Sequence, residues 1–104
     1  MWSTTPSFPW VCPLPLPPSC HSVGVSVFNK TLLSLIKPES VLTWVRGMMA
    51  NRMATDGTSW VSWFSKHNSG TINNQWMVVD MNVFEPFRSL RRGLLTIAEQ
   101  VPGA

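Results

Sequence analysis

Six of the nine prolines lie between Pro6 and Pro18, and this cluster limits the fold more than any other feature of the 104-residue chain. The first 29 residues carry no Asp, Glu, Lys or Arg. A membrane-spanning helix cannot form there, because proline lacks the backbone N–H and clashes with the preceding turn. No signal peptide is recognisable either, since the stretch lacks both an N-terminal cation and an unbroken apolar run. We expect residues 1–22 to be a Pro-rich disordered segment and residues 23–104 to be a partial domain.

Length and charge exclude several classes of protein. A chain of this length supports one hydrophobic core at most. It has eight Lys and Arg against five Asp and Glu, a net charge of +3, and no basic run longer than Arg91-Arg92. A nucleic-acid groove needs several cations on one face, so we expect no nucleic-acid partner.

The two cysteines, Cys12 and Cys20, have neither the spacing of a redox motif nor further zinc ligands beside them. They either form a disulfide in an oxidising compartment or remain free thiols. We therefore expect neither a metal site nor a cofactor.

Three short segments have the pattern of β-strands. Valines with a period of two predict a strand with one buried face over residues 23–28. Residues 72–80 are too continuously apolar for a surface strand, so we place them inside a sheet. Residues 94–98 follow a long loop and should pair antiparallel with that internal strand. Asp80 and Glu99 are the two acids that could meet across the resulting hairpin.

Two segments carry helical signals. The pair Pro38-Glu39 suits a first helical turn, and apolar residues then recur at spacings of three and four until Gly57. This pattern predicts an amphipathic helix of about four turns. Thr58 or Ser59 is then expected to cap a shorter helix. Together with the antiparallel hairpin, the two helices predict an α+β fold.

Amide side chains gather directly before the internal strand. The block from Asn68 to Trp76 contains four Asn and Gln residues among small, turn-forming ones. On a continuous strand, alternation puts Asn73 on one face and Asn74 on the other. Amide N–H groups that point at one spot can stabilise an oxyanion or bind a polar substrate. The same groups can instead hold neighbouring loops together, and the residues alone leave both roles open.

No other motif indicates catalysis. Neither His21 nor His67 has an obvious catalytic partner in the sequence, and the acidic residues show no paired spacing typical of acid–base work. Asn29 opens an Asn-Lys-Thr sequon, which can carry a glycan if the chain enters the secretory pathway.

Residues from about Ser26 to Gly103 resemble the phospholipase B-like proteins. The most specific part is the run Asn68-Ser69-Gly70-Thr71 followed by Asn73-Asn74-Gln75-Trp76-Met77-Val78-Val79-Asp80, and residues 26–33, 49–54, 64–66, 95–97 and 99–103 extend it. Members of that family are several times longer, and are secreted or lysosomal glycoproteins. They fold as N-terminal-nucleophile hydrolases with an αββα sandwich, and a cysteine exposed by internal cleavage attacks an ester or amide bond. The resemblance implies a hydrolase of acyl lipids or related amides that works through an acyl-enzyme.

The same resemblance suggests roles for the amide block. Asn73 or Asn74 resembles the asparagine that polarises the acyl oxygen, and we expect Asn73 to be catalytic and Asn74 structural. The remaining polar and aromatic residues of the block would shape the substrate site: Asn68, Thr71, Gln75 and Trp76. Asn29 becomes the expected glycosylation site in a lysosomal or secreted protein.

The family's nucleophilic cysteine lies upstream of the matched block, where this chain has its Pro-rich segment. We therefore expect an inactive fragment, and the expected partners are a phospholipid or acyl-amide substrate and the remainder of the family domain. A different class of function stays open, which is a non-enzymatic lipid- or protein-binding module with exposed tryptophans and methionines.

Overall fold

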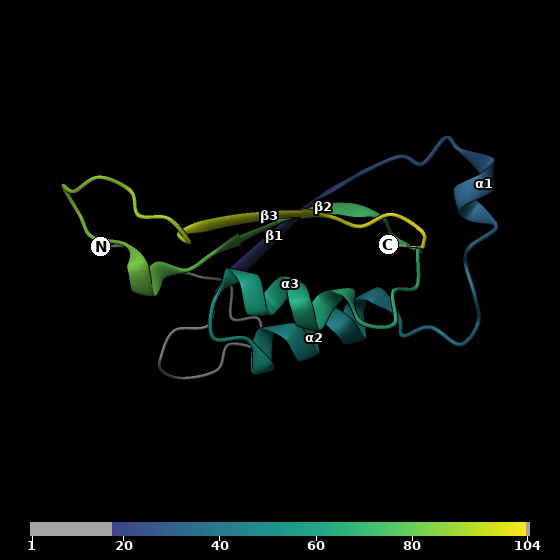
Figure 1. The fold of residues 1–104 in the computed structure, drawn as a ribbon, viewed down its shortest axis with the longest axis horizontal. Coiled ribbons are helices and arrows are strands. Elements are labelled where there is room, and N and C mark those ends of the chain that lie inside the picture. The colour runs from purple at the N-terminus through teal and green to yellow at the C-terminus, as the bar shows by residue number, and fades with distance from the viewer. Residues whose placement is uncertain (1–17, 104) are drawn as a thin grey trace.

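A computed structural model describes residues 18–103, which form one antiparallel sheet with helices against one of its faces (Figure 1). The three strands lie in the order β1-β2-β3 and are β1 (Ser19–Gly24), β2 (Asn74–Val79) and β3 (Leu95–Glu99). The helices are α1 (Lys30–Leu33), α2 (Thr43–Met53), α3 (Gly57–Ser65) and the 3-10 helix η1 (Met81–Val83).

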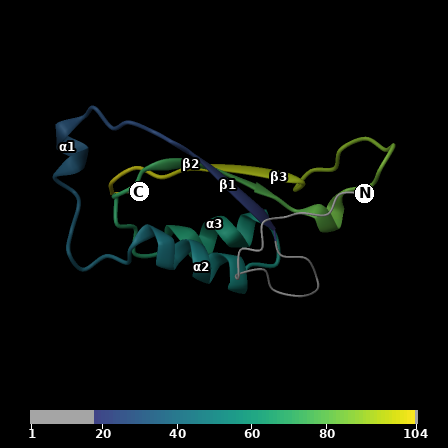
Figure 2. The same ribbon diagram turned by 180° about the vertical axis from the view of Figure 1, so that it is seen from behind.

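Helices α2 and α3 lie side by side under the sheet, whereas α1 stands apart at one end of the molecule (Figure 2). The predicted α+β class, with a hairpin and two covering helices, is confirmed. The described residues hold one sheet and one helical layer, so the four-layer sandwich implied by the resemblance is not confirmed.

The predicted hairpin is present. Strand β2 lies in the centre of the sheet and pairs antiparallel with both neighbours, as its continuous apolar run predicts. Within the hairpin Gln75 pairs with Glu99 and Val79 pairs with Leu95. Asp80 and Glu99 therefore lie at opposite ends of the hairpin, and the expectation that they could meet is wrong.

The first strand begins earlier than predicted. Strand β1 covers Ser19–Gly24, and the chain leaves the sheet after the Val25 N–H donates to the Asn73 carbonyl at 2.9 Å. Pairing along the whole length of β2 outweighs the local β-propensity of residues 23–28, because strand preference depends on the neighbours available. Residues 19–22 thus belong to the sheet, and residues 1–17 of the proposed Pro-rich segment lie outside the described residues.

The long helix is shorter than predicted. Residues 38 and 39 form a turn, and α2 begins only at Thr43. Its buried residues are Thr43, Arg46 and Ala50, whereas Met49 and Met53 are about half exposed. The apolar residues that recur at spacings of three and four therefore do not form the fully buried face of this helix. Sequence reasoning also missed α1, a single turn.

Helix α3 has the predicted extent but a different cap. The Ser59 N–H donates to Asp56 Oδ1 at 2.7 Å, and Ser59 Oγ accepts from the Asp56 N–H at 3.0 Å. This reciprocal pair is a capping box, with Asp56 as the cap instead of Thr58 or Ser59. The bond from the Ser59 N–H lowers the pKa of the Asp56 carboxyl.

The core lies between α3 and the inner face of the sheet. It consists of Trp60 and Phe64 with Ala50 and Val78, and Trp60 is completely buried. The Trp60 and Phe64 rings stack with centroids 4.8 Å apart, and Trp76 packs against Phe64 at 4.7 Å. The aromatic residues of α3 therefore anchor it to the sheet.

Two glycines provide a matched test of this packing. A Cβ at Gly57 would lie 2.8 Å from the Cβ of Thr96 and closer still to its Oγ1, whereas a Cβ at Gly47 would meet none of the described residues within 4 Å. We expect Gly57→Ala to destabilise the fold by about 1–3 kcal/mol, because α3 must move away from β3. Gly47→Ala should stabilise it by about 0.5–1 kcal/mol, because alanine is favoured inside a helix. Urea unfolding measures both, and effects of the same sign would contradict this packing.

Candidate functional site

The amide block folds into a compact loop before β2. Asn68 Nδ2 donates to the Val101 carbonyl at 2.7 Å, which ties the loop to the chain after β3. The Gly70 N–H donates to Asn68 Oδ1 at 3.0 Å, and Asn73 Nδ2 donates to the Gly70 carbonyl at 2.8 Å. Two of the amides thus close the loop on itself.

The backbone of this loop is not a strand. Gly70 and Ile72 have φ angles of 67° and 54°, in the left-handed region. Position 70 also requires glycine for space, because a Cβ there would lie 2.9 Å from Pro102 Cα. The strand begins only at Asn74, so the expected alternation of residues 71–75 across one strand is wrong.

A buried arginine lies behind the loop. Arg46 of α2 is 3% exposed, and its Nε and Nη1 donate to the carbonyls of Val41 and Phe64 at 2.9 and 2.6 Å. Its Nη2 donates to Gln100 Oε1 at 3.0 Å and to Ser69 Oγ at 3.3 Å. The guanidinium also lies 4.5 Å from the centre of the Phe64 ring. Burial lowers its pKa, and among residues 18–103 it forms no ion pair with a carboxylate.

Neutral side chains connect Arg46 to the amide loop. Gln100 Nε2 donates to the Thr71 carbonyl at 2.9 Å and lies 3.5 Å from Asn73 Oδ1. Thr43 Oγ1 donates to the same Thr71 carbonyl at 2.7 Å. We call Thr43, Arg46, Ser69 and Gln100 the arginine network. It joins α2, the loop and the end of β3.

Sequence reasoning missed the arginine network. Its only signal was the spacing of Thr43, Arg46 and Ala50, which repeats every three to four residues and marks one helix face. An arginine on a helix face is ordinarily a sign of solvent exposure, because arginine is seldom buried without an ionic partner.

The predicted site residues lie in different environments. The loop brings together Asn68, Thr71 and Asn73, with Asn74 at its end. Gln75 pairs with Val23 and Glu99, on the sheet face opposite that of Trp76 and Val78. Trp76 packs into the core, and its indole Nε1 is buried with no acceptor among the described residues.

The two candidate asparagines differ in their contacts. Asn73 is held within the loop, by its bond to the Gly70 carbonyl and its approach to Gln100. Asn74 reaches across to β1, where its Nδ2 donates to Ser22 Oγ at 3.1 Å in an exposed bond. The Gln100 N–H donates to the Asn74 carbonyl at 3.0 Å, so the backbone of Asn74 is fixed.

Cys20 lies on β1, an outer strand of the sheet. It pairs with Val78 and carries a free, half-buried thiol. Burial raises the pKa of this thiol to about 12, so almost none of it is thiolate at neutral pH. Cys12 lies outside the described residues.

Two further features concern the surface. The Asn29 side chain is exposed and accepts from the Thr31 N–H at 3.0 Å, which places the sequon at the N-terminus of α1. Between residues 18 and 103, no helix has both the length and the apolar character that crossing a membrane requires.

Comparison with known sequences agrees with the resemblance. The sequence model of the family described as Phospholipase B matches residues 20–104. The chain belongs to the phospholipase B-like family. It is 57% identical over 75 residues to phospholipase B-like protein B of Dictyostelium discoideum, covering 72% of this chain and 13% of that relative. It is 52% identical over 77 residues to human phospholipase B-like 1, covering 74% and 14%.

A third relative is the phospholipase B of Crotalus adamanteus, 49% identical over 77 residues that cover 74% of this chain and 14% of the relative. The phospholipase B-like chain therefore spans about one seventh of the length of these three relatives. Its match begins at residue 20, so the family sequence includes the first strand as well as the amide loop.

Proposed function

We propose that this chain is a segment of a phospholipase B-like hydrolase that cleaves acyl ester or amide bonds of lipids through an acyl-enzyme. In this proposal the segment supplies the amide donors that stabilise the acyl oxygen, while the nucleophile comes from another part of a full-length enzyme. The observation that carries the proposal is the buried arginine network, because it holds the amide loop in one arrangement.

A preorganised donor is what acyl transfer needs. Negative charge develops on the acyl oxygen in the transition state, and a donor that is already oriented stabilises that charge without reorganisation. Around the two asparagines the backbone is fixed on both sides. The Val25 N–H donates to the Asn73 carbonyl, and the Gln100 N–H donates to the Asn74 carbonyl.

The contacts favour Asn74 as the polarising amide. Each amide nitrogen has two hydrogens, and Ser22 Oγ engages one of those on Asn74 Nδ2. The other can meet a substrate oxygen. Asn73 is instead engaged inside the loop through both its nitrogen and its oxygen. We therefore propose the reverse of the division expected from the sequence, with Asn73 as the residue that holds the loop.

The remaining predicted roles form part of the same proposal. Asn68 and Thr71 would shape the polar end of the substrate site from within the loop. Gln75 and Trp76 would contribute from the two faces of β2. The exposed Asn29 would carry a glycan in a lysosomal or secreted enzyme.

The 104-residue polypeptide is expected not to hydrolyse phospholipid or fatty-amide substrates above buffer rates. Cys20 cannot supply the nucleophile at neutral pH, because its thiol has a pKa of about 12 and lies within a paired strand. Product release from labelled phosphatidylcholine measures this, with Cys20→Ser as the matched control. Turnover that the control abolishes, and that rises toward alkaline pH, would contradict this prediction.

A further inference from the structure

The segment between η1 and β3 combines exposed apolar side chains with arginines. We call residues 84–92 the Phe-Arg loop. Phe84, Phe87 and Leu90 are 42%, 108% and 74% exposed. The loop holds three arginines and one glutamate, which gives it two of the three net positive charges of the chain. It extends from one end of the sheet, at the opposite end of the molecule from α1 (Figure 1).

The Phe87 side chain does not stabilise the fold of residues 18–103 through packing. Its ring is fully exposed, and its φ of 60° lies in the left-handed region, where a bulky side chain is strained. Glycine or asparagine would suit this backbone better. An aromatic side chain that is strained and packs against no other residue between 18 and 103 fits a contact with a partner outside this part of the chain.

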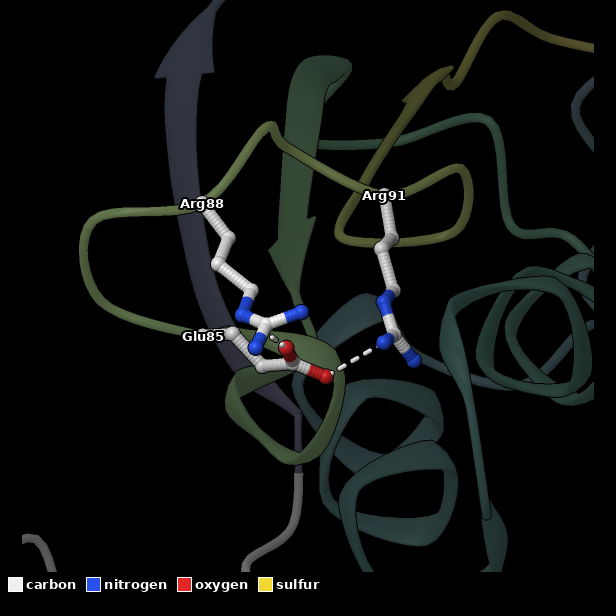
Figure 3. Close-up of polar contacts among 3 residues, drawn as sticks. All are labelled: Glu85, Arg88 and Arg91. Atoms are coloured by element: carbon white, nitrogen blue, oxygen red, sulfur yellow. Dashed lines mark ion pairs between the residues drawn. The ribbon is translucent and has the colours of Figure 1, made fainter.

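Glu85 forms ion pairs with two of the arginines. Arg91 Nη2 lies 2.5 Å from Glu85 Oε1, and Arg88 Nε lies 3.4 Å from Oε2, so both guanidinium groups converge on one carboxylate (Figure 3). Arg92 has no ion pair among residues 18–103. The hollow at this end is lined by Phe87, Arg88, Ser89, Leu90 and Arg91. Cations therefore lie directly beside the exposed phenylalanine.

The geometry points to a docking surface for an anionic phospholipid bilayer. Phenylalanine and leucine side chains insert at the boundary between the headgroups and the acyl chains, and arginine binds phosphate through two parallel hydrogen bonds. Weak attachment of this kind needs an apolar insertion together with a basic patch, and the Phe-Arg loop holds both.

The outer face of the sheet is also apolar but has a different character. Val23, Leu95 and Ile97 are 57%, 53% and 57% exposed there, and none of the strand residues that the structure describes on this face is a lysine or arginine. Without cations it has no charge complementarity to anionic headgroups. The charge pattern thus assigns lipid docking to the Phe-Arg loop and not to the sheet.

This inference goes beyond the proposed hydrolysis, because docking requires no turnover. The test uses the full 104-residue chain and co-sedimentation with two kinds of vesicle, one of phosphatidylcholine alone and one of phosphatidylcholine mixed equally with phosphatidylserine. We expect binding to the anionic vesicles at low salt, and its loss at high salt because counterions screen the arginines. Comparable binding to both vesicles, or none to the anionic ones, would overturn the proposal.

Pairs of matched variants test whether the Phe-Arg loop is the surface that binds the vesicles. Phe87→Ser should weaken binding to anionic vesicles about tenfold, whereas Phe28→Ser, at a residue 91% exposed near α1, should leave it unchanged. The triple variant Arg88→Gln, Arg91→Gln and Arg92→Gln should abolish binding. A control triple of equal charge loss, Lys30→Gln, Lys37→Gln and Arg52→Gln, removes exposed cations elsewhere.

The control triple should retain most of the binding, and far-UV circular dichroism verifies that all variants keep their fold. If both triples lose binding equally, net charge and not the loop is responsible, and the proposal fails. A chain that docks without hydrolysing lipid supports the proposal, whatever the outcome for the proposed hydrolase. Full activity of the Asn74→Ala equivalent in a full-length relative, together with vesicle binding by the 104-residue chain, would count only against the proposed function.

Discussion

Arg46→Ala is expected to destabilise the fold by about 3–5 kcal/mol, because several buried acceptors lose their donor at once and each costs about 1–3 kcal/mol when unpaired. The carbonyls of Val41 and Phe64, and the side chain of Gln100, all accept from this guanidinium. Relief of the arginine's own desolvation offsets part of the sum. Urea unfolding of the 104-residue chain measures the change.

Two control variants distinguish the loss of the arginine network from a general effect of removing an arginine from α2. Arg52→Ala removes an exposed arginine from the last turn of the same helix, and should change stability by no more than about 0.5 kcal/mol. Arg46→Lys keeps the charge but replaces the planar fork with a single nitrogen, so it should restore only part of the loss. Similar effects of Arg46→Ala and Arg52→Ala would show that the buried network does not hold the loop.

The two asparagines are expected to respond differently to alanine at the matching positions of a full-length, processed relative. The Asn74→Ala equivalent should lower the chemical rate by about 10²–10³ with little change in melting temperature, because it removes a donor to the acyl oxygen. The Asn73→Ala equivalent should instead destabilise the enzyme by roughly 1–3 kcal/mol, because the Gly70 carbonyl loses its partner.

Rate and melting temperature must be measured on the same samples. Full activity of the Asn74 variant would exclude it as the polarising amide. A large rate loss at Asn73 with unchanged melting temperature would restore the division expected from the sequence. If both variants lost rate and stability in proportion, the loop would act only as a structural element.

Local patterns were sufficient for the hairpin and for α3. Strand β2 is apolar on both faces, and such a run is stable only between two neighbouring strands. Helix α3 has aromatic residues on one face and a polar turn before it, so its extent followed from the sequence even though the capping residue did not. The amide block could also be identified from the sequence, since four amide side chains within eight residues are an unusual concentration.

The tertiary structure decided the register of the first strand, the buried face of α2 and the orientation of the amides. Strand β1 lies closer to the N-terminus than predicted because its position depends on pairing with β2, which is distant in the sequence: Ser19 pairs with Val79, and Gly24 pairs with Asn74. The buried face of α2 is polar because Arg46 finds acceptors on Ser69 and Gln100, which local periodicity cannot anticipate. The sequence alone determined the antiparallel hairpin and the extent of α3, and it showed where the amides gather. Hydrogen bonds between distant segments decided where those amides point, because their partners come together only in the folded chain.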